Sequence, residues 1–179
     1  MKTVLLANGS PHPDGSTAAA LRVMETVLHE KGVQTEWFQL APEPVRGCIA
    51  CEGCAKTHRC RFEDDQANEL LEKMTACDGV VFGSPVYFAG PNGAFLALLD
   101  RVFYAGSRHG RLFAGKPGAA VVTLWRAGST AALDRLNKYF AYSEMPTVTS
   151  SYWSMVHLGG DRFGEATVRT LAENMVELL

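Results

Sequence analysis

Short apolar runs alternate with amphipathic segments along the whole 179-residue chain, and this alternation limits the folds open to it. The first run, residues 3–7, is apolar without a break, as in a strand buried on both faces, and the segments between the runs carry apolar residues at helical spacing. We expect strands at residues 3–7, 33–39, 79–83 and 119–124, with a short fifth strand near Val148 or at 152–156. We expect helices at residues 17–30, 65–76, 93–104, 129–142 and 164–179. Five β–α units in series predict an α/β fold, a doubly wound five-stranded parallel sheet with helices on both faces.

Composition and charge narrow the organisation and the partners. With 47% hydrophobic and 20% charged residues and no internal repeat, residues 1–179 are expected to form a single domain. Lys and Arg total 17 against 19 Asp and Glu, so the net charge is −2. Without a basic excess, the usual attraction to nucleic acid or to an anionic membrane is missing, and we expect neither partner. No apolar stretch is long enough to cross a bilayer and no signal peptide is recognised, which favours a cytoplasmic location.

Ligands bind such sheets at the carboxyl ends of the strands, so the loops after the first, third and fourth strands are the places to search. The first loop, residues 8–17, offers glycine, hydroxyl groups and the N–H groups of a helix N-terminus, which are the ingredients of a phosphate cradle. No lysine follows Gly15, so this is not the Walker A loop of ATP-binding proteins, and a monophosphate such as FMN fits better. His12 is a further candidate contact to phosphate. A plain helix cap by Ser16 or Asp14 is the alternative.

The loop after the third strand, residues 83–93, is made rigid by two prolines and three glycines. Tyr87 and Phe88 stand at the carboxyl end of that strand, where aromatic side chains can cover a planar ring while backbone N–H groups point at its heteroatoms. Taken alone, the two aromatic residues would also fit a lining of the core.

These motifs occur together with Asp100-Arg101, and with Arg126-Ala127-Gly128 after the fourth strand. In this combination, Gly9-Ser10-Pro11…Gly15-Ser16-Thr17 and the run from Gly83 to Phe88 resemble the NADPH-dependent FMN reductase branch of the flavodoxin-like superfamily, over nearly the whole chain. The family typically has Arg-Gly-Gly where this chain has Ala127 in the middle. The resemblance implies FMN as cofactor and a flavodoxin-like sheet with the strand order 2-1-3-4-5.

The same resemblance assigns roles to residues of the three loops. It implies that the FMN phosphate is held by Ser10, Ser16 and Thr17. It implies that the ribityl chain and the isoalloxazine ring are lined by Pro85, Val86, Tyr87 and Phe88. Arg126 and Gly128 would lie along the pyrimidine end of the ring, where a cation or an N–H group stabilises charge on the reduced flavin.

Four of the five cysteines crowd into a cysteine-rich loop at residues 44–63, with the spacing C-x2-C-x2-C-x5-C. Thiolates at this spacing can wrap one face of a small cluster, whereas structural zinc usually joins two C-x2-C pairs across a longer loop. The spacing resembles the compact cysteine motif of the iron–sulfur flavoproteins, a subgroup of the same family. This resemblance implies a [4Fe-4S] cluster, close to FMN across a subunit boundary, with the ligands Cys48, Cys51, Cys54 and Cys60. From the residues themselves, free thiols, a redox disulfide pair and zinc stay open as alternatives.

Several other residues are interpreted as structural. Cys77 is expected to be an inert buried thiol. The run Glu63-Asp64-Asp65 is interpreted as favourable charge at a helix N-terminus rather than as an acidic metal site. The histidines without an evident functional partner are His29, His109 and His157.

The expected function is an FMN-dependent oxidoreductase, in which NAD(P)H passes a hydride to FMN and electrons continue to a quinone, a free flavin, another acceptor or the cysteine-bound cluster. One alternative is an iron–sulfur flavoprotein electron carrier fed by ferredoxin, without NAD(P)H activity. Another is a zinc- or thiol-based redox sensor without flavin. The hydride step needs no general acid from the protein, so no catalytic residue is assigned. The helix at residues 93–104 is apolar nearly all round, which predicts deep burial or packing on another subunit, as in a homodimer or homotetramer.

Overall fold

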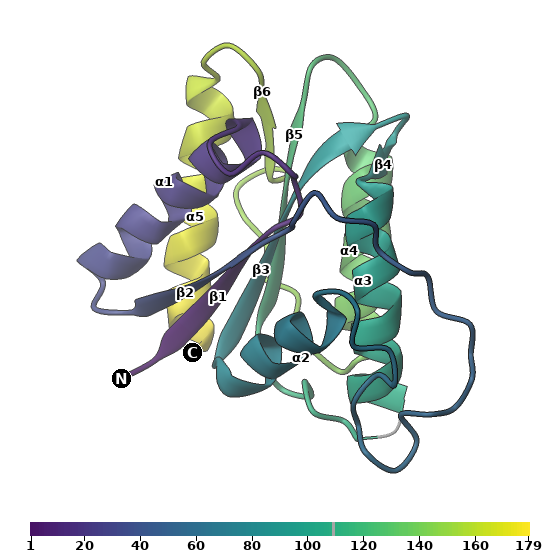
Figure 1. Cartoon of the computed structure of the whole chain (residues 1–179). Helices are drawn as coiled ribbons and strands as arrows, with labels where there is room; N and C mark the ends of the chain where they lie inside the picture. The colour runs from purple at the N-terminus through teal and green to yellow at the C-terminus, as the bar shows by residue number, and fades with distance from the viewer. Residues whose placement is uncertain (109) are drawn as a thin grey trace.

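The structure is a computed structural model that describes residues 1–108 and 110–179. His109, interpreted above as structural, lies outside the described residues. Figure 1 shows the elements, which are β1 (Thr3–Asn8), α1 (Ser16–Glu30), β2 (Gln34–Gln39), α2 (Ala67–Ala76), β3 (Gly79–Tyr87), β4 (Gly90–Pro91), α3 (Gly93–Phe103), a π-helical turn η1 (Tyr104–Arg108), β5 (Gly118–Leu124), α4 (Ser129–Tyr142), β6 (Met155–His157) and α5 (Arg162–Leu178).

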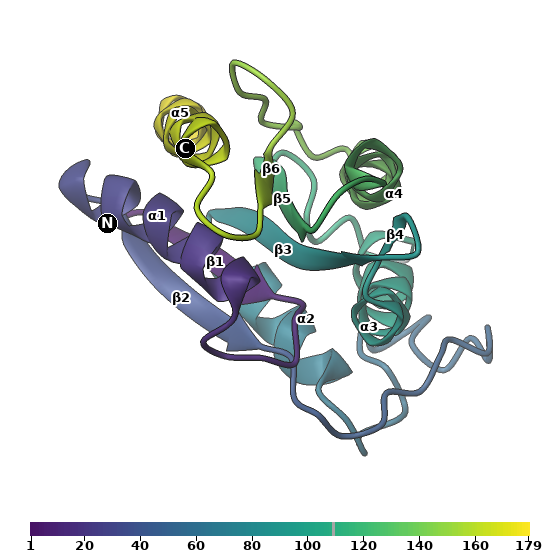
Figure 2. The same cartoon turned by 90° about the horizontal axis from the view of Figure 1, so that it is seen from above.

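Five strands form a parallel sheet in the order β2-β1-β3-β5-β6, and the short strand β4 pairs antiparallel with β3. Helices cover both faces of the sheet: α1 and α5 lie on one face, and α2, α3 and α4 lie on the other (Figure 2). The predicted α/β fold is thereby confirmed. The strand order 2-1-3-4-5 also holds for the parallel strands, once the unpredicted β4 is left out of the numbering. In the described part of the chain, no helix is long and apolar enough to span a membrane.

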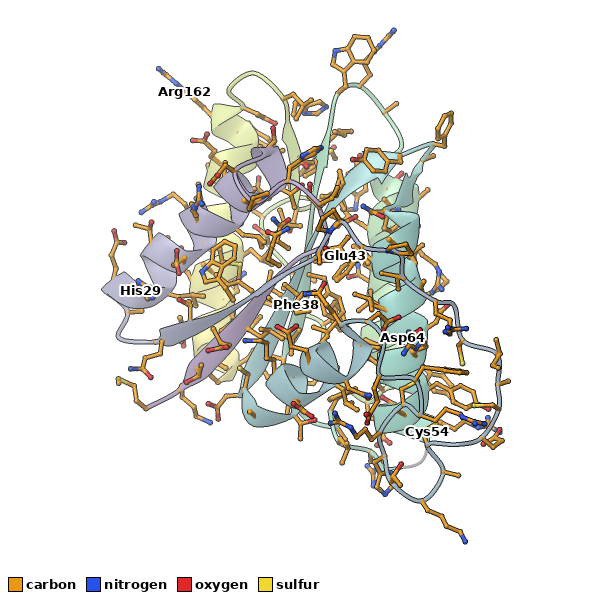
Figure 3. All side chains as sticks on the ribbon, viewed as in Figure 1. His29, Phe38, Glu43, Cys54, Asp64 and Arg162 are labelled. Carbon is orange, nitrogen blue, oxygen red and sulfur yellow. The ribbon has the colours of Figure 1, made fainter. Side chains whose placement is uncertain are left out.

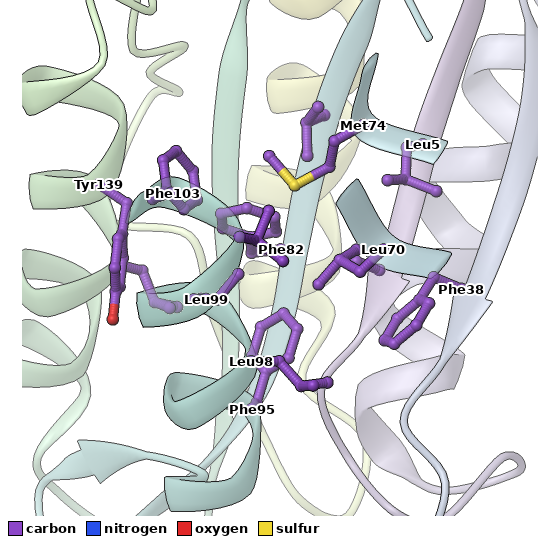
Figure 4. Close-up of a cluster of buried hydrophobic side chains, with 14 of the residues drawn as sticks. Leu5, Phe38, Leu70, Met74, Phe82, Phe95, Leu98, Leu99, Phe103 and Tyr139 are labelled. Atoms are coloured by element: carbon purple, nitrogen blue, oxygen red, sulfur yellow. The ribbon is translucent and has the colours of Figure 1, made fainter. Parts of the chain in front are cut away.

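Each face of the sheet carries its own hydrophobic core, because successive side chains of a strand point to opposite faces. Phe82 and Val81 are neighbours in β3 and belong to different cores. On the side of α2, α3 and α4, Phe82 is the centre of an aromatic cluster (Figure 4). Its ring stacks on Phe140 at a centroid distance of 4.9 Å, and meets Phe95 and Phe103 edge to face at 5.6 and 6.0 Å. This cluster fixes α3 against the centre of the sheet.

Helix α3 explains the run of apolar residues that the sequence places there. Its N-cap Asn92 accepts a hydrogen bond from the N–H of Ala94 at 2.8 Å, which starts the helix directly after β4. The buried side chains include Phe95, Leu98, Leu99, Val102 and Phe103. Deep burial within one chain therefore accounts for this helix, and contact with a second subunit stays a prediction.

Strand β3 is longer than predicted, because it continues to Tyr87 instead of ending at Gly83. Pro85 stands inside it without breaking the ladder. The pairing of β1 with β3 ends at Gly83, and Pro85 points to that same side, where no hydrogen bond is lost through its missing N–H.

The C-terminal elements also differ slightly from the predicted bounds. The fifth parallel strand is β6, while Val148 lies next to a single bridge between Thr147 and Gly118. Helix α5 begins at Arg162, two residues earlier than predicted, because the side chain of Asp161 caps it and accepts a hydrogen bond from the N–H of Gly164 at 2.9 Å.

Candidate functional site

The three loops expected to bind a ligand lie at one edge of the sheet, at the carboxyl ends of β1, β3 and β5 (Figure 1). Their strands are neighbours in register, with Asn8 opposite Gly83 and Pro85 opposite Thr123. The N–H of Gly9 donates to the carbonyl of Gly83 at 2.7 Å, which ties the first loop to β3. The topology thus brings together residues that are far apart in the sequence.

The first loop is held open in a fixed shape by side chains at its base. The N–H of Ser10 donates to the Asn8 side chain at 3.1 Å, and the N–H of His12 donates to the Ser10 hydroxyl at 3.2 Å. From β2, Gln39 donates to the carbonyl of Ser10 at 2.7 Å. Ser10 is buried, whereas His12 and Ser16 are exposed on the outer side of the loop.

Helix α1, which follows this loop, has an open N-terminus. Its N-cap residue is Gly15, no side chain caps the first turn, and the first turn contains no acidic residue. The predicted alternative, a cap by Ser16 or Asp14, is therefore wrong; Asp14 pairs instead with Arg22 at 2.9 Å. First-turn N–H groups without a cap, at the positive end of a helix dipole, suit an anion such as a phosphate.

Thr17 lies differently from the other predicted phosphate residues. Its side chain is buried, and its hydroxyl shares a hydrogen bond of 2.8 Å with the hydroxyl of Thr123 in β5. The hydroxyl thus joins the first loop to the end of β5, and it can donate to a phosphate only where it accepts from Thr123.

The second loop is a tight hairpin between β3 and β4, in which Tyr87 pairs with Gly90. The two residues of the turn, Phe88 and Ala89, both have positive φ angles, 50° and 62°. Such angles are those of the type I′ turn, and they are costly for residues other than glycine and asparagine. The side chain of Phe88 is fully exposed and that of Tyr87 is 48% exposed. Neither lines the core, so the alternative of a core-lining pair is wrong.

The third loop packs against this hairpin. Gly128 has φ +94°, and a Cβ atom added to it would lie 2.7 Å from the Cα of Ala89. Ala127, where the family typically has glycine, has no positive φ, so alanine is tolerated there. Trp125 and Arg126 are exposed at the tip of the loop. Together, the three loops offer an anion cradle at α1 and exposed aromatic and cationic side chains beside it, a set that fits FMN.

The cysteine-rich loop forms a second site at the other end of α3, as the position of Cys54 shows (Figure 3). All four cysteines of the predicted ligand set line one small pocket, together with Phe62, Arg101 and Tyr104. All five cysteines of the chain are free thiols. Within the described residues, no three His, Cys, Asp or Glu side chains converge closely enough to hold a single metal ion.

The two halves of the cysteine site differ in exposure. Cys48 and Cys51 are exposed, Cys60 is half-buried and Cys54 is buried. Burial raises the pKa of the Cys54 thiol, and the three neighbouring cysteines raise it further. Without a cation, this thiol therefore holds its proton, and a bound metal would have to displace it.

Arg101 is the main residue of this site for which the sequence analysis predicted no role there. It lies in α3, it is 2% exposed, and its Nε donates to the sulfur of Cys60 at 3.2 Å. It also forms a buried ion pair with Asp65. Asp65 itself accepts from the N–H of Ala67 at 3.1 Å just before α2, although the N-cap residue of that helix is Gln66. The signal that points to Arg101 is a charged residue within a helix that is otherwise apolar nearly all round.

Most of the remaining residues interpreted as structural do have structural partners. His29 bonds the hydroxyl of Thr35 at 2.9 Å, and His157 bonds the carboxylate of Asp161 at 3.1 Å. Cys77 is buried, and burial raises its pKa, so its thiol is unreactive in this position.

Comparison with known proteins agrees with this geometry. The sequence profile of the family "NADPH-dependent FMN reductase" matches residues 1–159. An iron–sulfur flavoprotein of Methanocaldococcus jannaschii is 32% identical over 165 residues, which cover 91% of this chain and 83% of that protein. An iron–sulfur flavoprotein of Archaeoglobus fulgidus is 25% identical over 186 residues, which cover 96% of this chain and 94% of that protein.

Two solved structures illustrate the fold. An NADH:FMN oxidoreductase in its apo form superposes with a TM-score of 0.73 at 16% identity, over 100% of this chain and 91% of that one. A flavodoxin from the domain Archaea superposes with a TM-score of 0.66 at 12% identity, over 99% and 97% of the two chains. At these identities the likeness concerns the fold alone. From the family match and the sequence relatives, the chain belongs to the NADPH-dependent FMN reductase family of flavodoxin-like proteins, within its iron–sulfur flavoprotein subgroup.

Proposed function

We propose that this protein is an FMN-dependent oxidoreductase of the cytoplasm that takes electrons from NAD(P)H and passes them to a quinone, a free flavin or another acceptor, with a [4Fe-4S] cluster held by the cysteine-rich loop. The match to the NADPH-dependent FMN reductase family supports the general activity, an oxidoreductase that uses FMN. The observation that carries the finer proposal is that all four cysteines of the motif line one pocket, apart from the three loops that fit FMN.

In this proposal, the chain holds FMN by its two ends. The phosphate lies at the N-terminus of α1, against the first-turn N–H groups and the hydroxyls of Ser10 and Ser16, with His12 and Thr17 as further contacts. The ring lies against the residues that end β3 and form the hairpin, which are Pro85, Val86, Tyr87 and Phe88. Arg126 and Gly128 face its pyrimidine end. When bound, FMN supplies hydride acceptance and single-electron transfer, and the protein positions the ring and sets the charge around it.

The spacing of the four cysteines that line this pocket supports a cluster over a zinc ion. Thiolates at the C-x2-C-x2-C-x5-C spacing of Cys48, Cys51, Cys54 and Cys60 can wrap one face of a small cluster. Structural zinc usually joins two C-x2-C pairs across a longer loop.

The two sites lie at opposite ends of α3, whose 11 residues span about 16 Å. Gly93, next to the hairpin, begins this helix, and Arg101, which contacts Cys60, lies in its last turn. Electron exchange over a shorter distance requires the cysteine loop of one subunit to lie near the FMN loops of another. We therefore propose a homodimer or homotetramer, and light scattering of the purified protein tests it; a monomer would contradict this part of the proposal.

A second candidate function is an electron carrier fed by ferredoxin without NAD(P)H activity. An iron–sulfur cluster exchanges single electrons, and the names of the relatives state the iron–sulfur and flavin groups without an electron donor. Steady-state oxidation of NADH and NADPH separates the two functions. Turnover with either nucleotide supports the reductase, and reduction only by reduced ferredoxin supports the carrier.

The proposed cofactors are tested by purifying the protein without exposure to air and measuring its absorption spectrum, FMN, iron and sulfide on one sample. Flavin bands with about four irons per chain are expected. Replacing Cys54 by alanine should abolish iron binding and leave FMN in place, whereas Cys77→Ala, a buried cysteine outside the loop, should retain both. Flavin without iron in the wild type would overturn the cluster, and iron without flavin would overturn the FMN site.

A further inference from the structure

Arg101 is a charged residue buried inside the molecule, and its hydrogen bonds lead to the cysteine-rich loop. Nε donates to the sulfur of Cys60 at 3.2 Å, Nη1 donates to the carbonyl of Arg46 at 3.2 Å, and Nη2 donates to the carbonyl of Phe62 at 3.0 Å. Nη1 also donates to the carboxylate of Asp65. The guanidinium therefore joins Arg46, which precedes the first cysteine of the loop, to Cys60, the last cysteine, and to the residues that follow it.

The loop is fixed most firmly at Cys60. Besides the contact of its sulfur with Arg101, its N–H donates to the side chain of Asn68 at 2.9 Å, and Asn68 donates back to its carbonyl at 2.9 Å. Asn68 and Arg101 are both buried, and they come from α2 and α3. Two helices of the rigid core thus hold one proposed ligand in position before any metal arrives.

Burying a guanidinium is costly even with a partner. Asp65 and the two carbonyls accept from Nη1 and Nη2, and the remaining Nε–H donates to a cysteine sulfur, which is a weak acceptor. An oxygen would satisfy this N–H better, so the choice of the Cys60 sulfur is the part that fold stability leaves unexplained. Resting on the proposed function, we propose that Arg101 is a positioning residue of the cluster site that fixes the Cys60 sulfur and raises the reduction potential of the cluster, and that Asp65 opposes this effect.

The physical reason is the charge added on reduction. One-electron reduction of the loaded site adds one negative charge and no proton, with dithionite as the electron source in the experiment. An N–H donor on a ligand sulfur and a buried cation both stabilise that charge, and outer hydrogen bonds to sulfur are known to set cluster potentials. The carboxylate of Asp65 lies on the far side of the guanidinium and cancels part of its charge. Removing Arg101 and removing the charge of Asp65 should therefore shift the potential in opposite directions.

The experiment is an anaerobic potentiometric titration of the iron-loaded protein, followed by absorption and electron paramagnetic resonance. Arg101→Gln should lower the equilibrium constant of reduction at least about tenfold, which is a fall of about 59 mV in the reduction potential for one electron. Arg101→Lys keeps the positive charge without the Nε donor, and its reduction potential should fall less. Asp65→Asn, which keeps an oxygen acceptor for the N–H of Ala67, should shift the potential upward. The control is Arg169→Gln, at an exposed arginine of α5 that pairs with Glu30 of α1. Its reduction potential should equal that of the wild type.

Should Arg101→Gln fail to fold, the lysine and Asp65→Asn variants decide. Potentials within about 18 mV of the wild type in both variants, which is a twofold change in the equilibrium constant of reduction, or shifts in the same direction, would overturn the inference while the cluster stands. A wild-type protein that binds no iron would instead overturn the proposed function.

Discussion

Gly128 occupies a position that no other residue type fits, for two separate reasons. Its φ of +94° belongs to the left-handed region, and a Cβ atom there would lie 2.7 Å from the Cα of Ala89. The close approach also concerns function, because Ala89 belongs to the hairpin that presents Tyr87 and Phe88. The loop after β5 can approach the hairpin this closely only with glycine.

Replacing Gly128 by alanine is therefore expected to push the two loops apart and to weaken FMN binding at least about tenfold, with a loss of about 1–3 kcal/mol in the free energy of unfolding. The measurements are an FMN titration by fluorescence and denaturant unfolding. Gly159→Ala is the control, because Gly159 has nearly the same φ, +93°, but open space around it. Equal losses of FMN affinity in the two variants would show that the close approach is unimportant.

Among single residues, those with a local signal could be predicted and those fixed by distant partners could not. Tyr87 and Phe88 follow an apolar strand, and their exposure agrees with a role in binding. For Arg101, the sequence showed only a charged residue in an otherwise apolar helix. Its partners could not be predicted, because Cys60 and Arg46 lie 41 and 55 positions away along the chain. The contact between Gly128 and Ala89 is equally non-local.

Among the elements, α5 shows how one side chain fixes where a helix begins. Asp161 accepts hydrogen bonds from the N–H groups of His157 at 3.0 Å and Gly164 at 2.9 Å. These two bonds, with a smaller contribution from the His157 side chain, hold the pKa of Asp161 below its ordinary value near 3.8. The ionised cap therefore stabilises the folded state, and the protonated cap does so less.

Replacing Asp161 by alanine is expected to cost about 1 kcal/mol of unfolding free energy at neutral pH. The folded pKa is lower than the unfolded one, so the charge-dependent part of the stabilisation is full above about pH 3.8 and disappears as the pH falls through the folded value. Urea unfolding across this range should show the difference between wild type and variant shrinking toward acid. Glu173→Gln, an exposed site on the same helix, should show no such loss. A difference that stays constant with pH would contradict the role of the charge.

Helical spacing and apolar runs were sufficient to predict the five α-helices and the parallel strands to within a few residues, but not the π-helical turn η1. They missed β4 and the end of β3, because Pro85 and the glycines around it are typical of a turn. Pro85 fits in β3 because the pairing with β1 ends at Gly83, so the missing N–H of Pro85 has no partner to lose. The sequence of β3 alone does not show where the neighbouring strand ends. The hairpin could not be predicted either, because its two turn residues, Phe88 and Ala89, are not the glycine or asparagine that usually mark such a turn.

In the whole molecule, the two candidate sites are joined by one rigid helix and share no residue. The FMN loops meet the N-terminal end of α3 and the cysteine pocket meets its C-terminal end. Because Cys48 and Cys51 are exposed and the two sites share no residue, a change of these cysteines is not expected to reach the flavin loops.

The iron-free double variant Cys48→Ser/Cys51→Ser should therefore bind FMN with a dissociation constant within about twofold of the wild type, because both cysteines are exposed and packed on nothing near the flavin loops. The measurement is an FMN titration under reducing conditions. A change of more than about tenfold would mean that the sites communicate within one chain or across a subunit contact. Gly128→Ala is the positive control, since it acts at the FMN site itself.

The continuation of β3 beyond its pairing with β1 limits where residues can be inserted into or deleted from this chain. The strand that anchors Phe82 in the core also carries Tyr87, and a shift of one residue in a strand turns every later side chain to the opposite face. An insertion or deletion of one residue between these two positions is therefore expected to turn Tyr87 away from the flavin loops. The stretch at residues 41–44, between β2 and the first carbonyl held by Arg101, carries no such constraint, and variation in length should accumulate there.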